Sequence, residues 1–378
     1  MANSYEETIR SEWEKFSSKD NKLLPNIMLL GATGCGKSSL INLIFHKELA
    51  LVNDASRGTN GFETYWGKDH GMSVNLIDSR GYEMEDGSEE SFFHYHDSIK
   101  EKMKESRKKA PLEKIHIVWF CISVAGGRIQ NYDIQILNLL REDSELRSRV
   151  AVVLTKCDED DDNGSEANRL KEILFDDVGR SLPVFEVSTD PELKLDLEKL
   201  MTWSANQLDD ADLKEAFVAS QMISLKAKRE ASVARIGFYA LAAAGIGASP
   251  IPISDAALLT PLQITMSTNI ILIYGLENFA SISKALIGNI VISNLGKAFA
   301  GGLLKLIPGI GTVAGGAINA GVASLITSAL GFAISEICYD TCKKIAKGEY
   351  VDMTLMFDAE SIQSYVQKYM KEHKKSDT

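Results

Sequence analysis

Apolar runs alternate with helical patterns along the first half of the chain. Five runs predict buried strands, at residues 27–30, 73–77, 115–124, 150–154 and 184–187. The stretches between them place apolar residues three and four positions apart, which is the period of a helix that buries one face. This alternation is typical of a mostly parallel sheet with helices on both faces. We therefore expect an α/β domain over residues 25–208.

A short amphipathic pattern precedes this domain, in residues 1–24. Ile9, Trp13 and Phe16 follow helical spacing, and Ser4 with Glu7 forms a possible capping box. The segment lacks the basic and apolar regions of a secretory signal. We expect a helix that packs on the following domain and a chain that begins in the cytosol.

The second half of the chain has a different composition. Residues 231–347 contain eleven charged residues, although 25% of the whole chain is charged, and three stretches carry no charge, at residues 236–254, 256–276 and 306–335. Helices that are apolar on most sides are buried in protein or in lipid. We expect a helical linker at residues 209–230, an all-α apolar domain at 231–350, and a C-terminal helix or tail at 351–378.

The residues after the first apolar run fit the pattern GxxxxGK[ST] and are followed by a helical pattern. In such a loop, successive backbone N–H groups turn toward a phosphate, and the helix N-terminus adds partial positive charge. We expect Lys37 to reach the outer phosphates and Ser38 Oγ to ligate Mg²⁺. The residues expected to bind nucleotide here are Gly31, Gly34, Cys35, Gly36, Lys37, Ser38 and Ser39.

A second candidate element closes the next apolar run. Residues 78–81 fit the pattern DxxG, in which the aspartate, here Asp78, holds Mg²⁺ through water. The backbone N–H of Gly81 is expected to meet the γ-phosphate. This adds two expected nucleotide-binding residues at the end of the second apolar run.

Two later segments indicate which base is bound. Thr155, Lys156 and Asp158 fit the pattern [NT]KxD, and we expect Asp158 to be a buried carboxylate that accepts two hydrogen bonds from guanine. Adenine cannot supply that pair, so its binding would leave polar groups unpaired. Ser188 and Thr189 follow the last run and are expected to offer backbone N–H groups to the guanine O6. The sequence therefore predicts a guanine nucleotide as the bound ligand.

These motifs and their spacing resemble those of Ras-like and, more closely, Era-like GTPases of the translation-factor-related class, over residues 25–205. The resemblance implies a P-loop G domain that hydrolyses GTP to GDP and phosphate with Mg²⁺. Residues 58–65 resemble the first switch segment, where Thr59 is the expected ligand and Thr64 is an alternative. The implied metal ligands are Ser38, Thr59 and Asp78, and the implied catalytic residues are Lys37, Thr59 and Gly81.

One departure from this family concerns the hydrolytic water. Tyr82 follows Gly81 at the position where Ras-like proteins carry a water-orienting glutamine. We therefore expect slow intrinsic hydrolysis unless another group positions the water.

The apolar half resembles domain-of-unknown-function family 697, which often follows Era-like G domains, in the segments 249–255 and 260–266. Thr260 and Pro261 predict the start of a helix that continues to about Leu276. Residues 285–306 and 311–347 predict a helical hairpin, with small residues at a spacing found both in membrane helices and in tight soluble bundles. Membrane association and a soluble helical bundle therefore both remain open.

The overall charge limits the class of partner. A formal net charge of −11 disfavours attraction to nucleic acid phosphates, so no direct nucleic acid partner is expected. The favoured function is a GTP-hydrolysing switch on the cytoplasmic side of a membrane, with membrane lipid as partner and a homodimer formed through the G domain or the hairpin. The alternatives are a cytosolic Era-like GTPase in ribosome- or RNA-linked assembly, and a GTP-driven membrane-remodelling machine.

Overall fold

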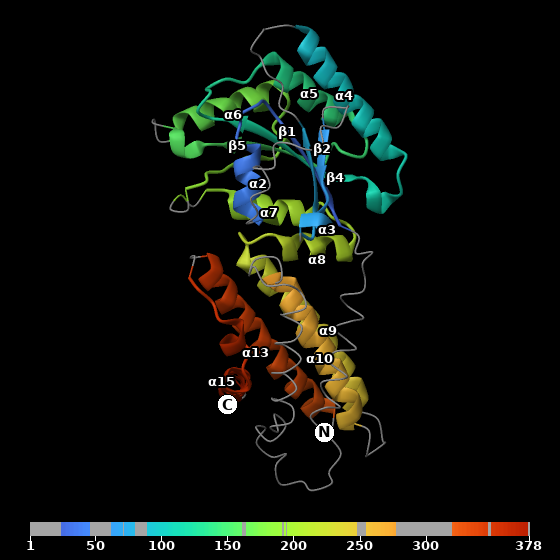
Figure 1. Ribbon diagram of the computed structural model, residues 1–378, viewed down its shortest axis with the longest axis vertical. Helices are drawn as coiled ribbons and strands as arrows, with labels where there is room; N and C mark the ends of the chain where they lie inside the picture. The colour runs from blue at the N-terminus through green and yellow to red at the C-terminus, as the bar shows by residue number, and fades with distance from the viewer. Residues whose placement is uncertain are drawn as a thin grey trace. The chain divides into compact units, whose positions relative to one another are not determined.

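The computed structural model separates the chain into two compact units, one formed by Leu23–Ser224 and one that contains Leu225–Thr378. Each unit is described by itself (Figure 1). The described residues are 24–45, 62–70, 72–79, 89–160, 164–190, 193, 195–247, 255–276, 320–346 and 349–376. The expected N-terminal helix lies outside them.

The first unit is built on a six-stranded sheet with the order β2-β3-β1-β4-β5-β6. All neighbouring strands are parallel except β2 and β3, which are antiparallel. The strands are β1 (Asn26–Leu30), β2 (Phe62–Tyr65), β3 (Asn75–Ser79), β4 (Ile115–Ser123), β5 (Val150–Thr155) and β6 (Val184–Glu186). The five predicted runs became the five parallel strands, and the predicted fold class is confirmed.

Helices cover both faces of this sheet (Figure 1). One face, with Met28, Val118 and Phe120, packs against α4 (Glu89–Arg107), α5 (Asn131–Glu142) and α6 (Ser165–Asp177). On the other face, Trp119 stacks on Phe45 at 6.5 Å between ring centroids and donates a 3.0 Å hydrogen bond to Ser204. Those partners belong to α2 (Lys37–Phe45) and α7 (Leu197–Asn206). Because successive strand side chains point to opposite faces, the central strands are apolar throughout.

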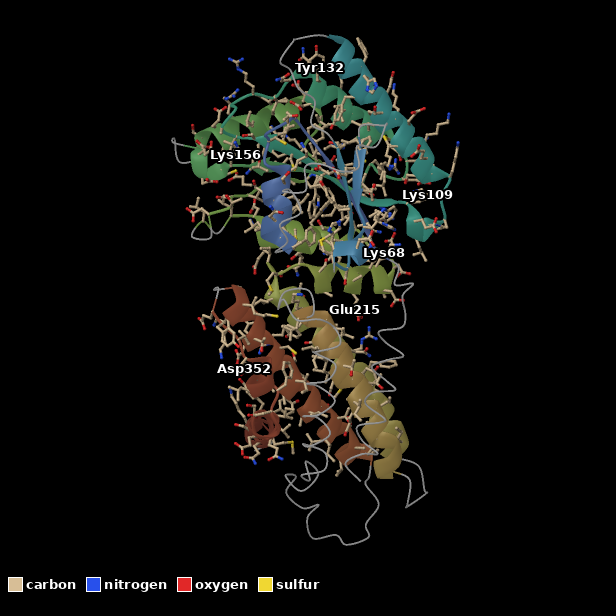
Figure 2. The ribbon with its side chains drawn as sticks, in the orientation of Figure 1. Lys68, Lys109, Tyr132, Lys156, Glu215 and Asp352 are labelled. Carbon is tan, nitrogen blue, oxygen red and sulfur yellow. The ribbon has the colours of Figure 1, made fainter. Side chains whose placement is uncertain are left out.

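Charged side chains lie mainly on the outside of this unit. Lys68 and Lys109 project outward in Figure 2, and both are exposed. The remaining short elements are α3 (Gly67–His70) and the 3₁₀ turns Pro111–Glu113 and Cys157–Glu159.

The strand β2 is an element that the hydrophobic pattern did not predict. Each of its four residues is only partly buried, so no continuous apolar run marks it. Its pairing with β3 places Glu63 opposite Asp78 and Thr64 opposite Ile77. It lies at the end of the sheet order, where an antiparallel strand can join an otherwise parallel sheet.

The region expected to be a helical linker contains two helices. Asp210 caps α8 (Ala211–Ser220) by accepting hydrogen bonds from the backbone N–H groups of Asp212 and Leu213. The next helix, α9 (Leu225–Gly247), begins after a break and belongs to the second unit.

The second unit is all helical, as expected, with α9, α10 (Asp255–Tyr274) and α13 (Ala320–Ala346) packed against one another. The helices α14 (Met353–Met356) and α15 (Ala359–Ser376) follow, and α15 packs on α13. At the centre, Gly331 allows α13 to lie against Ile236 and Met266, because a Cβ there would be 2.8 Å from Ile236 Cγ1 and 3.1 Å from Met266 Sδ. Three helices therefore meet at this glycine.

Buried polar contacts connect these helices. Ser232 Oγ and Ser335 Oγ are 2.8 Å apart, and Gln263 Nε2 donates to Thr327 Oγ1 at 3.1 Å. Lys228 is fully buried and donates to the carbonyl oxygen of Tyr274, at the end of α10, at 2.9 Å. A cation is favoured at a helix C-terminus, and buried polar groups are costly unless they are hydrogen-bonded.

The start of α10 differs from the prediction. The helix begins at Asp255, so Thr260 and Pro261 lie inside it rather than at its N-terminus. A proline in the second turn removes only one backbone hydrogen bond, and an acidic residue is favoured at a helix N-terminus. The first arm of the predicted hairpin, its turn and residues 311–319 lie outside the described residues.

Among the described residues, one helix is long and apolar enough to span a membrane. This is α13, which has a mean hydropathy of 1.6 over its most apolar window. However, 61% of that window is buried inside the protein. A buried core helix of a soluble protein has the same composition, so the length of α13 alone does not assign it to a membrane.

Two glycine substitutions test the packing of the helical unit. Gly331→Val should lower the free energy of unfolding by about 1–3 kcal/mol, because the added atoms meet Ile236 and Met266. Gly237→Ala, at an exposed position of α9 where an added Cβ meets nothing within 4 Å, should raise the free energy of unfolding by about 0.5–1 kcal/mol. Urea denaturation followed by circular dichroism measures both. Equal midpoints for Gly331→Val and the wild type would contradict this packing.

Candidate functional site

The loop between β1 and α2 approaches the main chain of β4 very closely. Gly31 has φ +133°, and a Cβ on it would lie 2.2 Å from the carbonyl oxygen of Cys121. Gly34 and Gly36 also have positive φ, at 75° and 91°. Side chains rarely adopt these angles, so all three glycines are needed for the conformation of the loop.

Lys37 is held over this loop by its own main chain. Its amino group donates to the carbonyl oxygens of Gly31 at 2.9 Å and Ala32 at 3.0 Å, and the residue is 7% exposed. A lysine ammonium has three donors, and two are fixed by these oxygens. Ser38 and Ser39 are exposed in the first turn of α2, whereas Cys35 is buried and its thiol pKa is raised by burial.

Thr155, at the end of β5, connects the loop to the [NT]KxD segment. Its hydroxyl donates to the carbonyl oxygen of Cys35, and its Cβ would be 3.3 Å from a Cβ on Gly36. The next residue, Lys156, adopts the left-handed conformation with φ 57°. The sheet therefore brings two motifs that lie 120 residues apart into direct contact.

Asp78 lies next to this loop at the end of β3. Its Oδ1 is buried with no hydrogen-bond partner in the described structure, and burial raises the pKa of the carboxyl to about 6, although Lys37 opposes the shift. Glu63 on the neighbouring strand raises that pKa further. An unpartnered buried carboxylate oxygen suits Mg²⁺, which binds oxygen ligands and keeps several waters. Asp78 therefore fits the expected ion, and Ser38 offers an exposed hydroxyl oxygen in the first turn of α2.

The strand register bears on the choice between Thr59 and Thr64. Directly paired residues share one face of a sheet, so Thr64 shares the face of Ile77, whereas Asp78 is on the opposite face. This placement favours Thr59 over Thr64 as a ligand beside Asp78. Thr59, Gly81 and Tyr82 themselves lie outside the described residues.

At the base-binding end, Ser188 fixes the orientation of Asp158. Its hydroxyl donates to Asp158 Oδ1 at 2.6 Å and accepts from the backbone N–H of Asp190 at 2.9 Å. Asp158 is exposed rather than buried, because it lies in a 3₁₀ turn beyond the end of β5. Thr189 is exposed as well. The backbone N–H of Cys157 donates to Val187, which joins the two base-binding segments.

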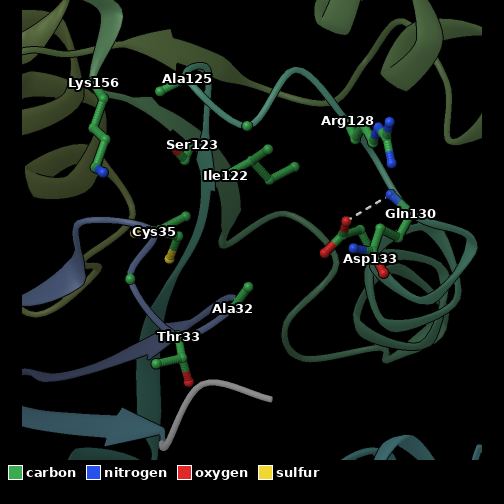
Figure 3. Close-up of a pocket in the computed structure, with 13 residues that line it drawn as sticks. Ala32, Thr33, Cys35, Ile122, Ser123, Ala125, Arg128, Gln130, Asp133 and Lys156 are labelled. Atoms are coloured by element: carbon green, nitrogen blue, oxygen red, sulfur yellow. Dashed lines mark hydrogen bonds between the residues drawn. The ribbon is translucent and has the colours of Figure 1, made fainter. Parts of the chain in front are cut away.

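A pocket of about 410 Å³ opens beside the phosphate loop (Figure 3). One wall is the loop itself, at Thr33, Gly34 and Cys35, and Lys156 closes one end. The other wall is the β4–α5 connection, where the backbone N–H of Gln130 donates to Asp133 Oδ2 at 2.8 Å. The sequence motifs did not predict this wall, because it has no fixed pattern.

Tyr95 is a further site residue that the sequence did not reveal. Its place with Ile99 and Met103 at four-residue spacing on α4 identifies a buried helix face. Nothing in that spacing shows that its hydroxyl lies 2.9 Å from Ser79 Oγ, beside Asp78.

Comparison with known proteins gives one family match. A family model described as 50S ribosome-binding GTPase matches residues 26–156. The matched residues contain β1 to β5, and the sheet with its helices has a G-domain fold. The match includes the phosphate loop, Asp78 and the first two residues of the [NT]KxD segment. No curated protein sequence matches the chain.

Solved structures give weaker similarities. A probable GTP-binding protein engB shares 18% identity, with 48% of this chain and 97% of that chain covered and a TM-score of 0.35. Toc33 from Arabidopsis thaliana, in complex with Mg²⁺ and GMPPNP, shares 15%, with 57% and 93% covered and a TM-score of 0.34. The LeoA bacterial dynamin GTPase from ETEC shares 12%, with 99% and 94% covered and a TM-score of 0.36. These values are too low to support an inference about this chain.

The contact between Thr155 and the phosphate loop of the G domain gives a prediction. Thr155→Val removes the hydroxyl at nearly constant volume and should weaken GDP binding about 3- to 10-fold, because the Cys35 carbonyl loses its donor. Thr155→Ser keeps the hydroxyl and should bind as the wild type does. Titration with a fluorescent guanine nucleotide measures both, and equal losses in the two variants would exclude the hydroxyl as the cause.

Proposed function

We propose that this protein binds GTP with Mg²⁺ and hydrolyses it to GDP and phosphate, as a nucleotide-dependent switch. The observation that carries the proposal is the contact of Thr155 with the phosphate loop while Ser188 orients Asp158. Phosphate and base recognition are thereby joined at the carboxyl ends of β1 and β5. This is the edge at which parallel sheets bind ligands.

Within this proposal, the residues of the loop have separate roles. The backbone N–H groups from Gly34 to Ser38 face the phosphates, and Lys37 turns its third N–H, which lies on Cys35 Sγ at 3.8 Å, toward the outer phosphates. Mg²⁺ supplies charge neutralisation on the phosphate oxygens, with Ser38, Thr59 and Asp78 as its protein ligands. The Gly81 N–H donates to the γ-phosphate. When hydrolysis removes that phosphate, the adjoining switch segments are released. Tyr82 in place of a glutamine supports a slow intrinsic rate.

The proposed base specificity is tested at Asp158. Asp158→Asn should abolish tight GDP and GTP binding and favour xanthine nucleotides, because the amide then pairs with a carbonyl where guanine has an amino group. Affinities for GTP, GDP, XTP and ATP, measured by calorimetry on both proteins with Mg²⁺, give the answer. The matched variant Asp160→Asn in the same turn should keep guanine preference. Equal affinity of the wild type for ATP and GTP would overturn the GTPase assignment.

We propose that the helical unit associates with a membrane through α9. Val233, Phe238 and Leu241 project from this helix, and Phe238 and Leu241 are 63% and 76% exposed. They lie beyond the charged first turns of α9, where Lys226 pairs with Glu230 and Arg229 pairs with Glu336. An exposed apolar helix face suits the interface of a bilayer. The face of α9 is a better candidate than α13, which is largely covered by protein.

Flotation with vesicles tests this membrane role. The double variant Phe238→Glu and Leu241→Glu should reduce the fraction bound to phosphatidylcholine–phosphatidylglycerol vesicles several-fold, because two charges replace the apolar contact. Leu355→Glu, at a residue that is 65% exposed on α14, is the matched control and should float with the vesicles as the wild type does. If the wild type stays unbound at all lipid concentrations, the protein is a cytosolic GTPase instead.

A further inference from the structure

The hydroxyl of Tyr95 lies between the phosphate loop and the end of β3. The backbone N–H of Gly31 points toward it at 3.4 Å, and Ser79 Oγ is 2.9 Å away. Tyr95 is 7% exposed and Ser79 is 2% exposed. The side chain therefore joins the first residue of GxxxxGK[ST] to the second residue of DxxG inside the protein.

Each end of this bridge continues into the nucleotide site. The carbonyl oxygen of Gly31 accepts a hydrogen bond from Lys37. Gly31 is therefore held at its N–H by Tyr95 and at its carbonyl oxygen by Lys37. On the other side, Ser79 directly follows Asp78 and precedes residues 80–88, which lead into α4. A continuous set of contacts thus connects Lys37 with the beginning of the segment that contains Gly81.

The Tyr95 hydroxyl takes part in two hydrogen bonds. Burial raises the pKa of Tyr95, so its hydroxyl keeps its proton at neutral pH. Gly31 N–H donates to Tyr95 Oη, and either hydroxyl can donate in the contact between Tyr95 and Ser79. Tyr95 is the residue of α4 that makes these contacts, while Ile99 and Met103 on the same helix face contact only the core.

A buried tyrosine needs hydrogen-bond partners in any protein, so satisfaction of the hydroxyl is the simplest role. Two facts indicate that the Tyr95 hydroxyl also has a role in the nucleotide site. Both partners belong to nucleotide motifs from different strands, and Tyr95 itself belongs to the helix that follows the expected second switch. A change in either motif or in α4 must therefore alter the same pair of contacts.

We propose that Tyr95 is a positioning residue that couples the phosphate loop to the γ-phosphate-sensing end of β3. The inference rests on the proposed GTPase function. With a γ-phosphate bound between Lys37 and the end of β3, the Tyr95–Ser79 contact holds α4 and Gly31 in the geometry that directs Lys37. GDP lacks the γ-phosphate and does not use this coupling. Tyr95 thus contributes to the preference for GTP over GDP rather than to overall nucleotide affinity.

The experiment compares GTP and GDP dissociation constants of the full chain with Mg²⁺, using a non-hydrolysable GTP analogue. Tyr95→Phe should weaken the analogue about 3- to 10-fold and change GDP by less than about 2-fold, as expected for one hydrogen-bonded contact. Ser79→Ala, which removes only the Tyr95–Ser79 contact, should also weaken the analogue selectively. The double variant should lose no more than Tyr95→Phe alone, because that contact is already absent there.

Tyr239→Phe in the helical unit is the matched control. It also removes a buried tyrosine hydroxyl, which accepts from Asn269 Nδ2 at 2.6 Å, and it should leave the analogue-to-GDP ratio unchanged. Equal losses for the analogue and GDP in Tyr95→Phe, or additive effects in the double variant, would overturn the coupling while leaving GTP binding intact. A wild type that binds neither nucleotide would overturn both the coupling and the proposed function.

Discussion

The close approach of Gly31 to the main chain of β4 is the constraint on which the nucleotide site depends. A Cβ at Gly31 would meet the carbonyl oxygen of Cys121 at 2.2 Å, so the chain can turn from β1 into α2 at this depth only without a side chain. That turn gives the following residues their conformation and brings Lys37 back over Gly31 and Ala32. The carboxyl ends of β3 and β5 then meet the loop from either side, because all three strands run in the same direction.

The fold could be predicted from sequence wherever one signal was continuous. The central parallel strands are buried on both faces and so appear as apolar runs, as in Val150–Thr155. The edge strand β6 is only partly buried, but Val184 and Phe185 still give it an apolar pattern. The strand β2 has no such run, because its residues are half-exposed at the sheet edge. The start of α10 was predicted from Thr260 and Pro261, which form a good local start signal, but the helix begins six residues earlier, at Asp255. Local start signals compete with packing along the whole helix, and here packing prevails.

In the candidate site, motif spacing predicts some residues, whereas other contacts are visible only in the folded structure. Spacing alone predicted the loop residues, Asp78 and Asp158 as site residues, because backbone geometry and hydrogen-bonding demand fix those residue types. The contacts of Thr155 with Cys35, and of Tyr95 with Ser79, join residues that are distant in sequence or lie on different elements. No periodicity encodes such pairs, since they depend on how strands are ordered and how helices are rotated. The exposure of Asp158 has the same origin, because the turn extends beyond the sheet.

Under the proposed function, the short segment from Thr155 to Asp158 combines two tasks. Its first residue contacts the loop proposed to hold the phosphates, and its last carries the carboxylate proposed to select the base. Only a single turn of backbone, with Lys156 in the left-handed conformation, separates them. Sequence changes that move the main chain of this segment therefore affect nucleotide affinity and base selectivity together. A change of base preference alone requires replacement of the Asp158 side chain with the path of the main chain unaltered.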